Sequence, residues 1–176
     1  MKRIEDIITT TLNGKVWQSA FFRSSRLSFL EEVVAMCKQN YCGMYGKTWT
    51  CPPGVGDLAH LKAKCLAYEN AFVFTTKHDL EDSFDIDGMD RAREIHAKIE
   101  RELQTALSGQ NFLCLGAGAC NVCKTCTYPT APCRFPGKAK TSMEACGISV
   151  VDLAKEVNVN YVNGANTVTY FSLILY

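Results

Sequence analysis

Four cysteines stand close together in the second half of the chain and constrain it more than any other feature. The run reads Cys-Asn-Val-Cys-Lys-Thr-Cys, and a fourth cysteine follows seven positions later, which gives the set Cys120, Cys123, Cys126 and Cys133. Thiols at two-residue spacing on a short loop can converge on three corners of an iron–sulfur cube, and a later cysteine can bind that cube or a second one. The spacing predicts a metal-binding loop built on these four residues.

Two other uses of clustered cysteines have to be weighed. A disulfide framework fits poorly, because neighbouring thiols at this spacing are badly placed for separate long-range bridges. The sequence also opens Met-Lys-Arg-Ile-Glu-Asp, without an apolar stretch for a signal peptide, so we expect a cytoplasmic protein, where clustered cysteines indicate metal or redox chemistry. Structural zinc stays as an alternative, although zinc sites usually take paired C-x2-C knuckles from two separated segments.

Three more cysteines, Cys37, Cys42 and Cys51, lie earlier in the chain at wider spacing, and we expect them to form a second metal centre. All five prolines lie within three residues of Cys51, Cys126 or Cys133, and proline stiffens a loop that holds sulfurs in fixed directions. In two-cluster ferredoxins the last cysteine of a run binds the other cluster, so Cys133 could instead join the early three. The alternative is that the early cysteines are structural and pack separately in the core.

Length and composition bound the remaining choices. A chain of 176 residues with 47% hydrophobic residues is expected to form one domain over 1–176 with its own core. The net charge of +1 gives no global field that would favour nucleic acid or a membrane surface. No apolar run approaches the roughly 18 residues of a membrane span.

Hydrophobic periodicity predicts alternating helices and strands. Apolar residues at helical spacing, with Asp57 as a helix cap and Gly109 as a stop, predict helices over 26–38, 58–66, 89–108 and 148–157. Short apolar runs predict strands over 71–75, 112–115 and 168–175. We therefore expect an α/β fold, a single mixed layer of helices and strands with the cysteine-rich loops gathered at one edge.

Residues close to the cysteines are expected to contact the metal group. Arg134 directly follows Cys133 and is expected beside the cofactor, while Trp49 and Tyr128 are expected to shield it from water, which tunes a cluster potential. Lysines near the run could offset the negative charge of four thiolates; these are Lys124, Lys138 and Lys140. Cys65 and Cys114, which lie in apolar stretches, are interpreted as small buried hydrophobic residues, and the three histidines as surface or helix-face residues rather than ligands.

Three stretches of the sequence resemble one family. They are Tyr45-Gly-Lys-Thr-Trp-Thr-Cys-Pro-Pro, the segment from Gly116 through Cys133-Arg-Phe-Pro, and Ser142-Met-Glu-Ala-Cys-Gly-Ile-Ser-Val. The resemblance runs from about Cys37 to the C-terminus and is to small prokaryotic proteins catalogued as predicted metal-binding proteins of unknown function. It implies metal binding, iron–sulfur in kind, in a prokaryotic and often anaerobic setting. Family members tend to have an aromatic residue where this chain has Cys146, so the resemblance does not mark Cys146 as a ligand.

These observations lead to a first hypothesis of electron transfer. A 4Fe-4S cluster on the late four cysteines, with a second cluster on the early three, would serve a redox partner protein. A second hypothesis is an enzyme in which a cluster held by three cysteines leaves one iron open as a Lewis acid for a small substrate. A third is a zinc-stabilised binding module without a redox role. The sequence assigns no catalytic residue to any of them.

Overall fold

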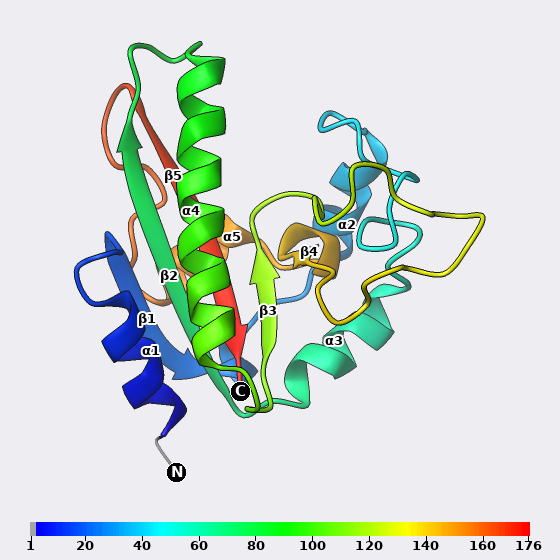
Figure 1. Ribbon diagram of the computed structural model, residues 1–176, viewed down its shortest axis with the longest axis horizontal. Helices are drawn as coiled ribbons and strands as arrows, with labels where there is room; N and C mark the ends of the chain where they lie inside the picture. The colour runs from blue at the N-terminus through cyan, green and yellow to red at the C-terminus, as the bar shows by residue number, and fades with distance from the viewer. Residues whose placement is uncertain (1–2) are drawn as a thin grey trace.

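The structure, a computed structural model, describes residues 3–176 and confirms the predicted mixed α/β class. Figure 1 shows the elements, which in chain order are α1 (Ile4–Leu12), β1 (Gln18–Arg23), η1 (Ser24–Arg26), α2 (Glu31–Lys38), α3 (Leu58–Leu66), β2 (Asn70–Asp79), α4 (Ile86–Ala106), β3 (Leu113–Gly116), β4 (Thr141–Ser142), η2 (Glu144–Cys146), α5 (Val150–Glu156) and β5 (Thr167–Leu175).

One sheet organises the described part of the chain. Its strands lie in the order β1-β2-β5-β3-β4. The first three pairs are antiparallel, and β3 pairs with the short β4 in parallel. β5 therefore lies inside the sheet, where Val73 of β2 and Leu115 of β3 both pair with Leu173.

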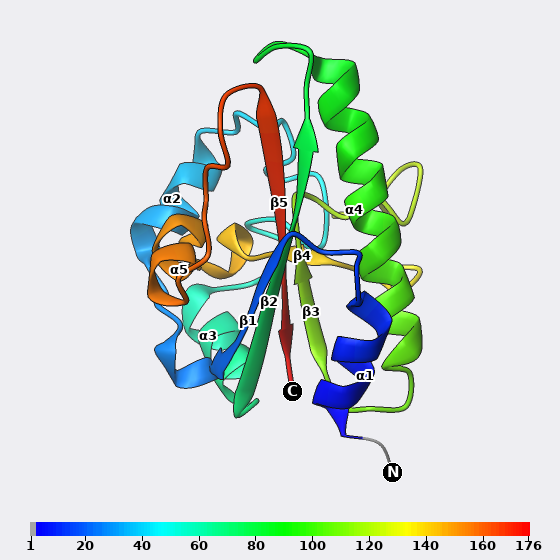
Figure 2. The ribbon, with the colours of Figure 1, turned by 90° about the vertical axis from the view of Figure 1, so that its left-hand side faces the viewer.

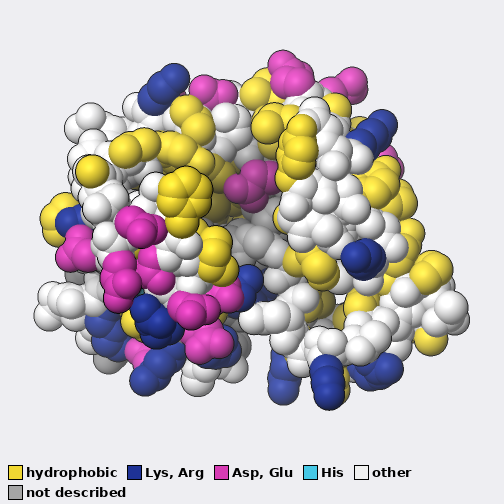
Figure 3. Space-filling view, turned by 90° about the horizontal axis from the view of Figure 1, so that it is seen from above, with side chains coloured by type: hydrophobic (Ala, Val, Ile, Leu, Met, Phe, Trp, Pro, Cys, Tyr) yellow, Lys and Arg dark blue, Asp and Glu magenta, His cyan; other side chains and the backbone are white. Residues whose placement is uncertain are grey.

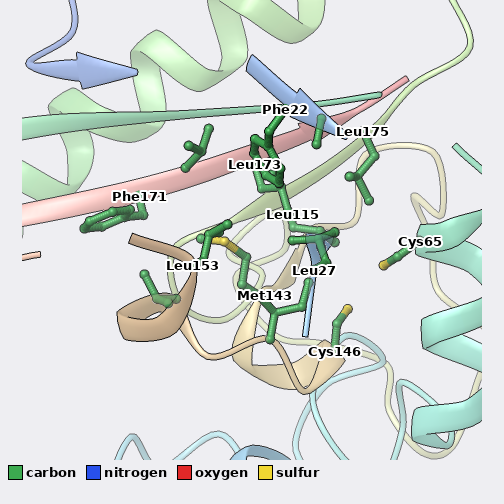
Figure 4. Close-up of a cluster of buried hydrophobic side chains, with 14 of the residues drawn as sticks. Phe22, Leu27, Cys65, Leu115, Met143, Cys146, Leu153, Phe171, Leu173 and Leu175 are labelled. Carbon is green, nitrogen blue, oxygen red and sulfur yellow. The ribbon is translucent and has the colours of Figure 1, made fainter. Parts of the chain in front are cut away.

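Helices cover both faces of this sheet. In Figure 2, α1 and α4 lie on one side of the strands, and α2, α3 and α5 lie on the other. Successive side chains of a strand point to opposite faces, so Phe72 and Phe74 of β2 pack with α1 and α4, whereas Ala71 and Val73 pack on the other side. The second, larger core includes the residues labelled in Figure 4. The sheet is thus buried on both faces.

Helix boundaries follow their caps. The carboxylate of Asp57 accepts from the backbone N–H of His60 at 2.8 Å and starts α3, as predicted. Asp85 accepts from Gly88 N–H at 2.7 Å, so α4 begins at Ile86, three residues before the predicted start. The helix predicted over 26–38 begins only at Glu31, because the preceding segment is extended and Phe29 forms a β-bridge with Ile148.

The two cysteine segments lie beside the β3–β4 edge. The early segment follows α2, and the late segment connects β3 to β4; Figure 1 shows both as loops on the same side of the sheet. Over residues 3–176, no helix has the length and apolar character needed to cross a membrane.

Candidate metal centre

The two cysteine loops pack directly against each other. The indole N–H of Trp49, in the early loop, donates to the carbonyl of Ala131 in the late loop at 3.0 Å. The ring of Trp49 also meets the ring of Tyr128 edge-on, with centroids 4.9 Å apart. Segments about 80 residues apart in sequence therefore form one unit. The prediction that Trp49 and Tyr128 contact a cofactor remains a prediction, and the structure places both at the junction of the loops.

The larger of two cavities in this unit has a volume of about 560 Å³. All four late cysteines line it, together with Trp49 and Phe135 and the backbone of the early loop; the cysteines are Cys120, Cys123, Cys126 and Cys133. Each of the four thiols is partly exposed. The spacing in the sequence thus brings four soft sulfur donors to one cavity with aromatic walls.

The smaller cavity has a volume of about 260 Å³ and is lined by all three early cysteines, Cys37, Cys42 and Cys51. Cys37 lies near the C-terminal end of α2, as predicted, and Cys51 stands before the two prolines. Gly118 and Ala119 line this cavity, while the next two residues of the chain line the larger one. The early and late cysteine cavities are therefore both bordered by the segment 118–121, which includes Cys120.

The sulfurs of the two groups have different electrostatic surroundings. Burial raises the pKa of Cys51, and the neighbouring Cys42 thiol raises it further. Burial raises the pKa of Cys37 in the same way. For Cys126, burial alone would raise the pKa, but hydrogen bonds from the backbone N–H groups of Tyr128, Trp49 and Thr127, together with the nearby Arg134, lower it overall. Negative charge on sulfur is therefore stabilised at Cys126 and disfavoured at Cys37 and Cys51.

Arg134 braces the late loop from outside. Its guanidinium donates to the carbonyl of Thr125 at 2.8 Å, and the residue is exposed. Lys124 and Lys138 are also exposed. Lys140 is different, because its ammonium group lies 2.8 Å from the Glu100 carboxylate and its side chain is only 15% exposed. Lys140 was expected to offset the charge of thiolates. The structure instead pairs this lysine with a buried glutamate on α4.

The donor set fits a thiolate-bound metal, but the sulfurs do not converge. Among residues 3–176, no three His, Cys, Asp or Glu side chains form a group that could hold a metal ion. Soft thiolates are the ligands of zinc and of iron–sulfur clusters, and seven cysteines that could supply them line the two cavities. Ligand sites are seldom fully formed before the metal binds, because metal binding and local folding are coupled.

The remaining cysteines lie away from these cavities. Cys65 on α3 and Cys146 in η2 are buried in the core, where Figure 4 shows the two thiols turned toward each other. This confirms Cys65 as a buried residue and places Cys146 in the core. Cys114 packs against the core beneath α4, but its sulfur accepts from the amide of Gln104 at 3.3 Å, so its surroundings are partly polar.

A buried polar network beneath α4 escaped the sequence interpretation. The predicted stripe of α4 contained only apolar residues, yet Ile95 is 51% exposed, whereas His96 and Glu100 are almost fully buried. Ser172 of β5 lies between them: the His96 Nε2 atom is 2.8 Å from its hydroxyl, which donates to Glu100 at 2.9 Å. The heptad-like spacing of His96, Glu100 and Leu103 was the available signal, because all three share a helix face.

This network does not have the arrangement of a hydrolase. In a serine–histidine–carboxylate triad the histidine lies between the other two and deprotonates an accessible serine. Here the serine lies in the middle, and Ser172 has no exposed surface. Nucleophilic catalysis by Ser172 is therefore excluded by its position.

The chain matches a known protein family. A family model described as "Predicted metal-binding protein (DUF2284)" matches residues 20–176, which include both cysteine loops and the sheet. Searches of curated proteins and of solved structures found no match.

Proposed function

Because the chain belongs to this family of predicted metal-binding proteins, we propose that it is an iron–sulfur protein that exchanges electrons with a redox partner. Cys120, Cys123, Cys126 and Cys133 would hold a 4Fe-4S cluster in the larger cavity. When bound, such a cluster supplies reversible one-electron chemistry. The protein would work in the cytoplasm, where its thiols stay reduced.

One observation carries the proposal: four cysteines line a single cavity of about 560 Å³. Zinc sites usually take paired C-x2-C knuckles from two separated segments, whereas three of these four cysteines follow one another at two-residue spacing. A polynuclear cluster is larger and places each sulfur at a separate corner. Hydrogen bonds from backbone N–H groups to Cys126 support the same choice, since such bonds stabilise a negatively charged cluster and set its potential.

The early cysteines would hold a second metal centre. Cys37, Cys42 and Cys51 line the adjoining cavity, and a fourth ligand is needed for a complete 4Fe-4S cube. Cys120 is close enough for a charge on it to raise the pKa of Cys51. Exchange of a cysteine between the two groups is therefore sterically reasonable, as it is in two-cluster ferredoxins.

The partner would dock at the basic outer side of the late loop. Residues 117–140 contain three exposed basic residues, Lys124, Arg134 and Lys138, and no acidic residue, while Lys140 in the same stretch is paired with Glu100. By contrast, residues 79–90, at the end of β2 and the start of α4, contain six acidic residues and no Lys or Arg. Figure 3 shows acidic side chains gathered on one side of a hollow in the surface, with Lys and Arg side chains among and below them, and further basic side chains at the outer rim on the other side. An acidic redox protein would be steered to the basic side.

Anaerobic purification with metal analysis tests the proposal. The protein should be brown and should contain iron and acid-labile sulfide in equal amounts, with about four irons for one cube and about eight for two. The absorption near 400 nm should bleach on addition of dithionite and return on reoxidation. Stoichiometric zinc without sulfide, after expression with adequate iron, would overturn the proposal in favour of a zinc-stabilised module.

A further inference from the structure

The polar network beneath α4 extends from half-buried His78 near the end of β2 to the floor of the cysteine loops. His78 Nε2 lies 3.0 Å from the hydroxyl of Thr76, which lies 2.8 Å from His96 Nδ1. His96 Nε2 lies 2.8 Å from Ser172, and Ser172 donates to Glu100 at 2.9 Å. Every link is a good hydrogen bond. Among residues 3–176, no buried side-chain nitrogen or oxygen lacks a partner.

The donors and acceptors of this hydrogen-bonded series can be assigned in one consistent direction. An ionised carboxylate only accepts hydrogen bonds, so Ser172 donates to Glu100 and its oxygen accepts from His96 Nε2–H. His96 Nδ1 then accepts from the Thr76 hydroxyl, whose oxygen accepts from His78 Nε2–H. Burial lowers the pKa of His96 to about 4, which keeps its imidazole neutral in this arrangement. The neighbours of each group thus fix its tautomer or hydroxyl orientation.

Glu100, the last group of this hydrogen-bonded series, lies near the wall of the two cysteine cavities. Glu100 and Lys140 line a small cavity of about 100 Å³ whose other wall is the backbone from Gly116 to Ala119, and Asn121. Ala119 also lines the early cysteine cavity, and Asn121 lines the late one. Close approach is built in at Gly116, where a Cβ atom would lie 2.8 Å from Glu100. Glu100 is therefore separated from both cysteine groups by one backbone segment.

We propose that His78, Thr76, His96, Ser172 and Glu100 form a proton relay that couples proton uptake to reduction of the cysteine-bound centre. The coupling rests on the proposed redox function. A single electron from a low-potential one-electron reductant adds negative charge beside the backbone segment. A proton delivered to Glu100, on the other side of that segment, offsets the added charge and leaves the Lys140 ammonium, 2.8 Å away, without its carboxylate counter-charge.

The transfer balances with one electron and one proton. A proton from solvent adds to the free imidazole nitrogen of His78, and each hydrogen-bonded proton moves to the next acceptor. Glu100 ends as a carboxylic acid. Both imidazoles are left in the opposite tautomer and both hydroxyls are reversed, and rotation or a return transfer on reoxidation resets them. Only N–H and O–H bonds form and break.

The first experiment needs no metal. In protein labelled with ¹⁵N-histidine, NMR should show His96 as the neutral Nε2–H tautomer, and its N–H should exchange with solvent much faster than backbone amides of α4. Thr76→Val keeps the shape of the side chain but removes the hydroxyl, and it should slow this exchange by roughly 10²-fold, as for loss of one positioned proton-transfer group. Thr76→Ser is the matched control and should exchange like the parent protein.

Ser172→Ala breaks the relay one link further on and should slow exchange in the same way, which covers failure of Thr76→Val to fold. Equal exchange rates in all variants would overturn the relay. This outcome is independent of whether the protein binds iron.

The second experiment tests the coupling in iron-loaded protein. Reduction in weakly buffered solution with a pH indicator should take up one proton per electron. Glu100→Gln should retain iron and sulfide, still be reduced, and take up no proton. Undiminished uptake in Glu100→Gln would overturn the coupling. Absence of iron and sulfide in the parent protein would instead refute the redox function and with it the coupling, while the exchange result would still decide the relay.

Discussion

The space beneath α4 and the loops at the β3–β4 edge both contain reactive side chains. Only beneath α4 are these side chains fully paired with one another. Beneath α4, His96, Ser172 and Glu100 satisfy one another, and Lys140 neutralises the carboxylate. At the sheet edge, seven partly or fully exposed cysteines line two cavities without forming a group that could hold a metal ion among the described residues. The chain itself completes the polar network beneath α4, and we propose that a metal group completes the cysteine loops.

The difference has a physical origin. A buried carboxylate or imidazole without a partner is costly, so such groups must be paired when the chain folds. A thiol is a weak donor and acceptor and tolerates partial exposure without a partner. Cysteines can therefore line a cavity without a hydrogen-bond partner, whereas His96 and Glu100 need their partners when the chain folds. The two regions should respond in opposite ways to loss of metal and to loss of a buried polar group.

The largest effect is expected from the late loop. Cys123→Ser or Cys126→Ser should remove essentially all iron from the larger cavity, because a serine oxygen is a poor ligand for the cluster. The loop should then become sensitive to protease, since its order is linked to metal binding. Iron and sulfide analysis with limited proteolysis measures both effects.

The region beneath α4 supplies the internal control for this change. Far-UV circular dichroism of the sheet and helices should be retained in both serine variants. Full iron content in Cys126→Ser would show that the late run is not the metal site.

An intermediate effect is expected from the early loop. Gly43 and Gly46 have φ angles of 71° and 68°, so the chain makes the tight return that brings Cys42 and Cys51 to one cavity. A Cys42→Ala, Cys51→Ala double variant should lose about half of the iron, from about eight to about four atoms per chain if two cubes are bound.

An unchanged iron content in the double variant would show that Cys42 and Cys51 are structural residues and not metal ligands. In that case the substitutions should also change the free energy of unfolding by about 1 kcal/mol or less, because Cys42 is exposed and Cys51 is only partly buried, so neither packs in the core. A denaturant titration beside the iron count checks this.

The third effect concerns pH and the region beneath α4. The pKa of His96 is lowered to about 4, chiefly by burial, while an unfolded histidine titrates near 6.5. The unfolded chain therefore binds a proton first as the pH falls. The free energy of unfolding should drop between pH 6.5 and pH 4, by about 3 kcal/mol in total for this group. The charged or titratable groups that face His96 are Arg93, Glu100, His78, Tyr170 and Lys140.

Denaturant titrations at several pH values measure this slope. His96→Gln should flatten it, since the variant no longer has the buried imidazole. His60→Gln is the matched control, because His60 is exposed, and it should leave the slope unchanged. An equal slope in the parent and His96→Gln proteins would assign the acid sensitivity to other groups.

The sequence predicted the elements better than their contacts. Asp57 and the apolar periodicity placed α3 and most of α4 correctly, because caps and helical spacing are local signals. The start of α2 was placed too early, since the Phe29–Ile148 bridge is a contact between residues far apart in sequence. The late cysteine set was recognisable from spacing alone, and the structure brings all four to one cavity.

The missed features were the polar ones. The buried face predicted for α4 included Ile95 but not His96 or Glu100. Charged residues are normally absent from a helix face that packs on a sheet, so the prediction left these two out. Their burial depends on Ser172 and Lys140, which come from other parts of the chain. The packing of Trp49 against the late loop is likewise visible only in three dimensions.

The smallest effect is expected from the core cysteines. Cys65, on α3, is buried beside Cys146 of η2, and Cys114 lies beneath α4 with its sulfur near Gln104. Cys65→Ala or Cys114→Ala removes one sulfur atom from a packed site, which should lower the free energy of unfolding by about 1 kcal/mol. Neither thiol lines a cysteine cavity, so iron and sulfide should stay at the parent level. Loss of iron in Cys114→Ala at unchanged stability would break the separation between the two regions, because it would make a thiol from beneath α4 part of the metal site.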